Sequence, residues 1–89
     1  MPFRYKRGID RGYNDQGWIF FHCLQYRRLP KKDQERIWKH CQEAGGEYAE
    51  ALLEFVTTER GYAAICMKHH LSKDTLYRAV KKFYEGFPG

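Results

Sequence analysis

The stretch HHLSKDTLYRAVKKFYEGFP, residues 69–88, decides the fold that this sequence predicts. Ser72 belongs to the residue types that cap helices, because its hydroxyl oxygen accepts a hydrogen bond from a backbone N–H of the first turn. The residues after it predict one helix, which ends near Gly86 and Pro88. The apolar residues of that helix recur at helical spacing, and the inward stripe consists of Leu76, Ala79 or Val80, and Phe83.

A shorter helix, YAAICMKHH, precedes this one, and the two together predict a helix-turn-helix over residues 61–85. We expect the small side chains of Ala63 and Ala64 to let the two helices cross closely, as this motif requires. We expect Leu71 in the turn and Leu76 in the second helix to fill the angle between them.

Once the stripe faces inward, the last helix presents a basic and polar face outward. A recognition helix places its N-terminal residues against base edges in the major groove. Arginine can bind guanine through two hydrogen bonds, while lysine and tyrosine can hold phosphates. The free N–H groups behind Ser72 offer a further phosphate site. The outward face consists of Lys73, Asp74, Tyr77, Arg78 and Lys81, with Thr75 and Lys82 at its edges.

The remaining sequence completes an all-α prediction of about five short helices in a single domain, residues 1–89. Residues 1–16 mix basic, aromatic and glycine residues and predict an irregular arm. Residues 17–60 predict a helical core, whose first helix is capped by Asp15. Pro30 fits the first turn of the second helix, where its missing N–H costs nothing.

The composition describes a small, folded and basic protein. Of its 89 residues, 17% are aromatic, which is enough apolar surface for a modest core. The net charge of +5 is segregated, with an acidic stretch at residues 47–60 between basic ends. Three cysteines without dense spacing argue against a disulfide scaffold. Neither a membrane span nor the apolar segment of a signal peptide is present, so we expect a cytoplasmic protein.

Two segments resemble a known group of regulators. LSKDTLYRAVKKF, residues 71–83, resembles the turn and recognition helix of helix-turn-helix proteins, where Ser-x-x-Thr-Leu/Val-x-Arg recurs. LPKKDQERIWKHC, residues 29–41, is similar to the helix that opens region four of sigma factors. Small phage and prophage proteins that resemble sigma region four share this order. The resemblance implies a transcriptional regulator that inserts its last helix into the major groove of double-stranded DNA in a bacterial host.

The resemblance also implies individual DNA contacts, and the chain departs from the pattern at two positions. The turn usually carries glycine where this chain has His70, a residue that accepts the left-handed conformation better than most. Asp74 puts a carboxylate near the helix tip, where it repels phosphate, accepts from cytosine N4 or favours the helix dipole. The implied contacts are Ser72, Lys73, Thr75, Tyr77, Arg78 and Lys81, and Lys82 completes the predicted site from the edge of the same face.

The N-terminal residues have two interpretations. Arg4, Lys6 and Arg7 form an arm that reaches into a minor groove, as homeodomain arms do. Alternatively, Phe3 and Tyr5 pack the terminus against the helices.

A different class of function remains open, namely a phage-encoded module that binds a host protein such as polymerase or a defence component. Its binding face would be the acidic helix with Glu47, Glu50 and Glu54, or the aromatic N-terminus. For DNA binding, a homodimer formed through the first helix would supply a second half-site. We expect no membrane partner.

The sequence predicts no enzyme, no catalytic residue, no cofactor and no metal. A zinc site assembled from His22-Cys23, His40-Cys41 and Cys66-x-x-His69 is the alternative for these residues. All three cysteines fall on apolar helical faces, however, where a free cysteine acts as a small hydrophobic residue.

Overall fold

The computed structural model describes residues 6 and 8–87, and within these residues all regular structure is helical, with no strand. The predicted all-α class is therefore confirmed. None of the helices in the described ranges combines the length and apolar character that crossing a membrane requires. The elements are α1 (Tyr13–Leu24), η1 (Tyr26–Arg28), α2 (Lys31–Gly45), η2 (Gly46–Tyr48), α3 (Ala49–Thr57), α4 (Tyr62–His69) and α5 (Lys73–Gly86), where η marks a short 3-10 helix.

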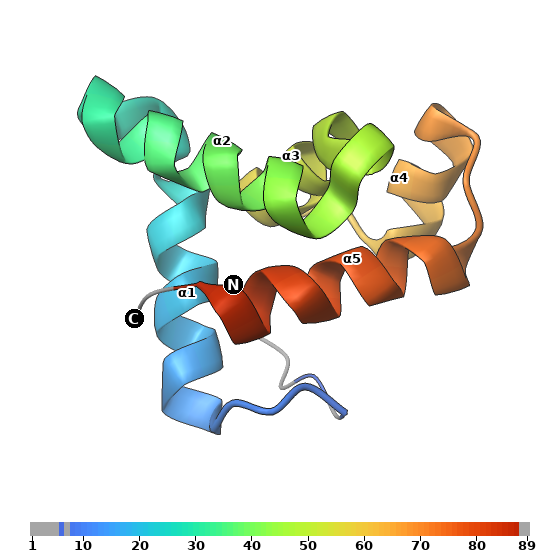
Figure 1. The fold of residues 1–89 in the computed structure, drawn as a ribbon, viewed down its shortest axis with the longest axis horizontal. Coiled ribbons are helices and arrows are strands. Elements are labelled where there is room, and N and C mark those ends of the chain that lie inside the picture. Colours follow the sequence, from blue (N-terminus) through green and yellow to red (C-terminus); the bar gives the residue numbers. More distant parts are fainter. Residues whose placement is uncertain (1–5, 7, 88–89) are drawn as a thin grey trace.

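The helices pack around one hydrophobic core (Figure 1). α2 and α5 lie side by side and run in opposite directions, and α1 crosses them near the C-terminal end of α5. α3 packs against α1 and α2, and α4 packs against both α3 and α5 at the other end of the molecule. The last helix therefore packs against α2, α3 and α4.

The predicted inward stripe of α5 is confirmed. Leu76 and Val80 have no exposed surface, and Phe83 is 1% exposed. Ala79 is buried as well, so both of the alternatives at that turn face inward. Tyr84 extends the stripe. Each such large apolar side chain contributes about 1.5–3 kcal/mol when it leaves water, so α5 is fixed by its buried face whatever its outer face does.

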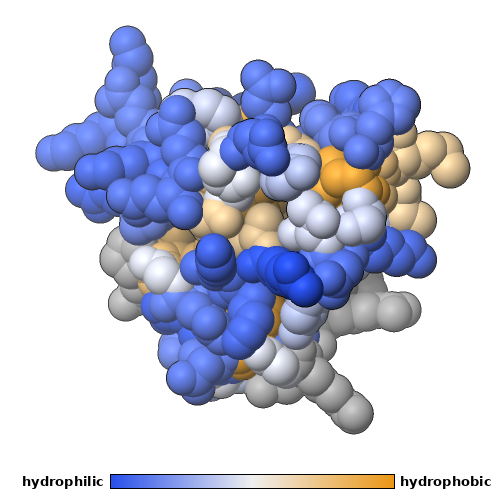
Figure 2. All heavy atoms as spheres, turned by 45° about the vertical axis from the view of Figure 1, so that its right-hand side comes forward, coloured by the Kyte–Doolittle hydropathy of each residue, from blue (hydrophilic) through white to orange (hydrophobic). Residues whose placement is uncertain are grey.

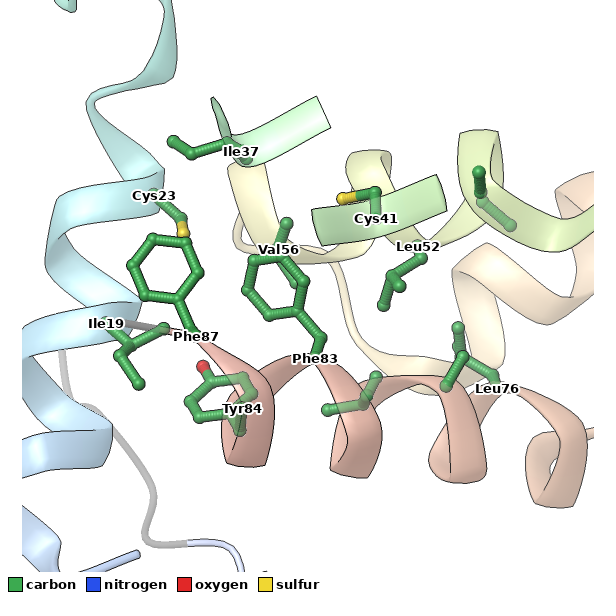
Figure 3. Close-up of a cluster of buried hydrophobic side chains, with 14 of the residues drawn as sticks. Ile19, Cys23, Ile37, Cys41, Leu52, Val56, Leu76, Phe83, Tyr84 and Phe87 are labelled. Carbon is green, nitrogen blue, oxygen red and sulfur yellow. The ribbon is translucent and has the colours of Figure 1, made fainter. Parts of the chain in front are cut away.

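Aromatic rings fill the corner between α5 and α1. Figure 3 shows Tyr84 of α5, and Phe87 directly after the helix, beside Ile19 and Cys23 of α1, while Phe83 points toward Val56 of α3. The rings of Phe83 and Phe87 lie 5.2 Å apart, within the range of favourable aromatic pairs. This corner anchors the crossing of the first and last helices.

The start of α1 differs from the expectation. The helix begins at Tyr13 with Gly12 as its N-cap, so Asp15 lies in the first turn and does not cap it. An acidic side chain in the first turn still interacts favourably with the helix dipole. The earlier start places Gln16 on the inner face of α1, where its side chain has no exposed surface and must bond within the protein. The predicted arm of residues 1–16 is therefore wrong from Tyr13 onward.

A proline and a pair of glycines mark the two ends of α2. Pro30 precedes the helix as its N-cap residue, just before the first turn in which we expected it. The helix ends at Gly45, and Gly46 takes a φ of +55°, a conformation that glycine adopts at little cost.

Candidate nucleic-acid interface

The turn between α4 and α5 contains a left-handed histidine. His70 has φ 57° and ψ 49°, and no other non-glycine residue in the described ranges has a positive φ. The N–H of Leu71 donates to the carbonyl of Cys66 at 3.1 Å, which closes the end of α4. The conformation expected of His70 is confirmed, and it brings the chain round so that α5 can begin at Lys73.

Ser72 caps α5 as predicted. Its Oγ accepts a hydrogen bond from the N–H of Thr75 at 3.1 Å. The hydroxyl oxygens of Ser72 and Thr75 lie 2.8 Å apart and form a second hydrogen bond. Both hydroxyl groups therefore fix the start of the helix before any ligand is present.

The packing of α4 against α5 does not use the residues that the sequence indicated. Ala63 and Ala64 are exposed, so the expectation that they allow a close helix crossing is wrong. Ile65, with no exposed surface, faces the core in their place, together with Leu76. Leu71 is half-buried against the same core. The helical rotation of α4 turns its one large β-branched residue inward, because that burial contributes more than close approach at alanine.

One half of the outward face of α5 is open to solvent. Lys73, Asp74, Arg78 and Lys82 are exposed. An Nη of Arg78 lies 3.0 Å from Oδ2 of Asp74, and the two side chains are 77% and 72% exposed. Asp74 is thus an intrahelical partner of Arg78 in the free protein. Figure 2, in which this end of the molecule comes forward, shows hydrophilic side chains over much of the face.

The other half of that face lies beneath the N-terminal segment. A Cβ on Gly8 would lie 2.6 Å from Oη of Tyr77, so the backbone of this segment rests on the tyrosine. The N–H of Asp10 donates to Oε2 of Glu85 at 2.7 Å, and Nζ of Lys81 donates to the same oxygen at 3.0 Å. These hydrogen bonds lower the pKa of Glu85 and raise that of Lys81. Tyr77 and Lys81 are half-buried as a result.

The side chains of Arg11 and Gln16 also hold the N-terminal segment in place. A guanidinium nitrogen of Arg11 donates to the carbonyl of Phe87 at the end of α5. Gln16 accepts from the N–H of Lys6 at 2.8 Å and donates to the carbonyls of Lys6 and Arg11 at 3.1 and 3.0 Å. Gln16 was not predicted to have this role, although it lies three residues before Ile19 and therefore on the same helical face.

Lys6 is held away from the position of a minor-groove arm. Its ammonium lies 5.3 Å from the ring centre of Tyr84, 5.8 Å from that of Phe55 and 5.9 Å from that of Phe20. Burial lowers the pKa of Lys6. Of the two interpretations of the N-terminal residues, the minor-groove arm is therefore wrong at Lys6, because this residue packs against the helices. The residues Arg4, Arg7, Phe3 and Tyr5 of the two interpretations lie outside the described residues.

The acidic face of α3 is only partly a solvated face. Oε1 of Glu54 lies 3.0 Å from Nζ of Lys68 and 3.0 Å from Nε2 of His69 in α4. Oε2 of Glu54 lies 3.0 Å from a guanidinium nitrogen of Arg60. The hydrogen bonds from His69 and Lys68 lower the pKa of Glu54. Glu54 ties α4 to α3, whereas Glu50 is exposed and available to solvent.

Two of the three cysteines are structural. Cys23 and Cys41 are buried, and burial raises the pKa of the Cys23 thiol to about 12 and that of Cys41 as well. Such thiols stay protonated at neutral pH and make poor metal ligands or nucleophiles. Within the described part of the chain, no three His, Cys, Asp or Glu side chains are grouped to hold a metal ion.

A second surface lies on the outer side of α1. Tyr13, Trp18 and Phe21 are 61%, 50% and 47% exposed. They line a shallow hollow together with Gly17 and the indole-stacked ring of His22, whose centre lies 4.8 Å from that of Trp18. Among the residues that the structure describes, no acidic or permanently basic side chain lines this hollow. Large exposed aromatic side chains of this kind are typical of protein-binding surfaces.

No protein-family model matches this chain, and neither a curated protein nor a solved structure shows a significant match to it. The arrangement of its own side chains is therefore the basis for assigning a function.

Proposed function

We propose that this chain is a small DNA-binding protein in which α4, the turn at His70 and α5 act as a helix-turn-helix. The observation that carries the proposal is the left-handed turn followed by a capped helix whose first two turns expose Lys73, Asp74 and Arg78. Recognition helices dock in the major groove with this end forward. The order of residues 29–41 and 71–83, which resembles that of small phage and prophage regulators, supports the narrower proposal of a phage or prophage transcriptional regulator in a bacterial host.

The exposed residues of α5 contact different parts of the DNA in this proposal. Arg78 contacts a base, because a guanidinium can bind guanine O6 and N7 together, while Lys73 and Lys82 contact phosphates. The exposed pair of Arg78 with Asp74 contributes only about 0.3–0.5 kcal/mol. A bidentate contact to guanine contributes about 1–3 kcal/mol of discrimination, so the pair opens on binding. Asp74 then lies free to accept from cytosine N4.

Tyr77 and Lys81 stand at the edge of this interface. They meet the N-terminal segment in the free protein, and Lys81 is paired with Glu85. Their contribution to DNA binding is therefore smaller than that of Arg78 in this proposal. Ser72 and Thr75 act through the cap, which fixes the start of α5.

The test is a titration of the full chain with duplex DNA at several salt concentrations. Affinity should fall linearly on a plot of log K against log salt. Arg78→Ala should weaken binding about tenfold, the equivalent of one guanine contact, and Asp74→Asn should strengthen binding because it releases Arg78. Arg60→Ala, which removes a cation of the α3–α4 connection, is the charge-matched control and should bind as wild type. Absence of binding at low salt, or wild-type binding by Arg78→Ala, would refute the proposal.

The alternative is a protein-interaction module, and the exposed aromatic side chains of α1 favour it. Trp18 and Phe21 would fill pockets of a host protein or of a second copy of the chain. Sedimentation of the wild type and of Trp18→Ala distinguishes a second copy of the chain from a host protein as the partner. A dimer that Trp18→Ala dissociates identifies a second copy, and a monomer that also ignores duplex DNA leaves the host protein as the partner.

A further inference from the structure

The greatest concentration of positive charge lies away from α5, on η1 and the first half of α2. Residues 27–39 contain six basic and two acidic side chains, so they carry four of the five net charges of the chain. The two acids are Asp33 and Glu35. The cations, which we call the η1–α2 basic patch, are Arg27, Arg28, Lys31, Lys32, Arg36 and Lys39, and all six are exposed.

No cation of this patch has an ion pair among the described residues. In α4 and α5, by contrast, ion pairs at 3.0 Å join Lys68 to Glu54, Arg78 to Asp74 and Lys81 to Glu85, and among the described pairs only Lys73 and Lys82 of these helices have none. An anion that binds a paired cation must first displace a carboxylate, while an unpaired cation has only water and counterions to release. The patch is therefore the most available anion-binding surface of the described chain.

The fold holds the patch together. The side chain of Gln34 donates to the carbonyl of Tyr26 at 2.7 Å, which fixes η1 beside the second turn of α2. Ile37 is buried with 1% exposure, so the opposite face of α2 is directed outward. Lys32, Arg36 and Lys39 follow the i, i+4, i+7 spacing of one helical face and span about 10 Å along the axis.

A regularly charged polyanion fits this row. Duplex DNA carries one charge for about every 1.7 Å of its axis, so a row of about 10 Å faces several phosphates. A membrane surface fits poorly, because interfacial helices insert an apolar face beside their cations, and the apolar face of α2 is buried in the core. An acidic protein fits poorly as well, because lysine is depleted from the centres of protein interfaces.

We propose that the η1–α2 basic patch binds the phosphate backbone of nucleic acid without reading its bases, as a surface separate from α5. Figure 1 places the start of α2 at one end of the longest axis and the turn between α4 and α5 at the other. The patch therefore acts whether or not α5 reads DNA.

The experiment compares two triple variants of the full chain in titrations with random-sequence duplex over a range of salt. Lys32→Gln/Arg36→Gln/Lys39→Gln removes three of the six cations of the patch, and Lys73→Gln/Arg78→Gln/Lys82→Gln removes the same charge from α5. The first variant should lower the slope of log K against log salt by about 2–3, at about 0.9 for each lost phosphate contact. The loss should be equal for unrelated sequences. Helical circular dichroism of each variant controls for folding.

The outcomes separate this inference from the proposed function. If the patch variant keeps the wild-type slope, the inference is overturned, whatever the α5 variant does. If the α5 variant binds as wild type while the patch variant fails, the inference stands and the function proposed for α5 fails. Glu35→Gln, which removes an exposed acid between the cations, should strengthen binding, and a weakening would count against the patch. Equally tight binding to vesicles of anionic lipid at the same salt would overturn the assignment to nucleic acid.

Discussion

Gly8 lies against the phenol of Tyr77 so closely that a Cβ on the glycine would be 2.6 Å from the tyrosine Oη. Gly8 also has a φ of +83°, which side-chain-bearing residues rarely adopt. The conformation and the contact both require glycine at this position. The N-terminal segment can therefore lie on α5 only because residue 8 has no side chain.

Gly8→Ala should destabilise the protein by about 1–2 kcal/mol, the cost of a left-handed alanine, with the steric contact adding to it. Urea denaturation followed by tryptophan fluorescence measures the change. Gly86→Ala is the matched control, because a Cβ there meets nothing within 4 Å. It should leave the free energy of unfolding unchanged or slightly higher. Equal stability of Gly8→Ala and wild type would contradict the close packing on Tyr77.

His70→Gly should stabilise the protein by about 0.5–1 kcal/mol, because glycine adopts positive φ without the steric cost that histidine bears. His70→Val should destabilise it, since a β-branched side chain tolerates this conformation least. Thermal denaturation measures both changes. Met67→Gly, inside α4 and 80% exposed, serves as the comparison and should lose about 1 kcal/mol. If glycine at residue 70 is as costly as glycine at residue 67, the turn is not left-handed.

Glu54→Gln should lower the free energy of unfolding at neutral pH by about 1 kcal/mol, in the range of partly exposed ion pairs. The pKa of Glu54 is lowered in the folded protein from its ordinary 4.5. The carboxylate therefore stabilises the fold above about pH 4.5, and this contribution is lost as the pH falls through the lowered pKa. The free energies of unfolding of wild type and Glu54→Gln should therefore become equal at low pH. Urea denaturation of both proteins from pH 7 to pH 3 measures this.

Glu50→Gln is the control for this experiment, because Glu50 is exposed on the same helix. It should change stability by less than about 0.5 kcal/mol at any of these pH values. A difference between wild type and Glu54→Gln that stays constant from pH 7 to pH 3 would show that the carboxylate charge has no part in holding α4.

Iodoacetamide at pH 8 should modify Cys66 well before Cys23 and Cys41 in the native protein. Cys66 is half-buried, whereas the other two are buried. With a pKa of about 12, the Cys23 thiol is ionised to about one part in ten thousand at that pH. Mass spectrometry of peptides from a time course distinguishes the sites, and all three should react in urea. Rapid native modification of Cys23 would contradict its place in the core.

Local patterns allowed much of the last helix to be predicted. Ser72 is recognisable as a cap because its partner Thr75 is three residues away, and Leu76 and Phe83 share a helical period. His70 was expected to take the left-handed conformation because the turn offers no glycine, and it does so. These features depend on neighbouring residues, which a single sequence displays directly.

Long-range contacts could not be predicted in the same way. The partners of Glu54 lie on another helix, and no periodic pattern joins Glu54 to Lys68 or His69. The covering of Tyr77 by Gly8 joins the two ends of the chain. Both contacts follow from how the helices pack, so half of the predicted DNA-binding face was assigned without knowledge of what lies on it.

Gln16 has a consequence for how the chain can vary. Its amide binds both the N–H and the carbonyl of Lys6, ten residues before it, and so closes the backbone between them into a loop of defined length. Within that loop, Gly8 must reach Tyr77 while Asp10 reaches Glu85. A single inserted or deleted residue would shift these contacts out of register, so natural variants of this protein should keep the number of residues in the loop and the glycine at residue 8.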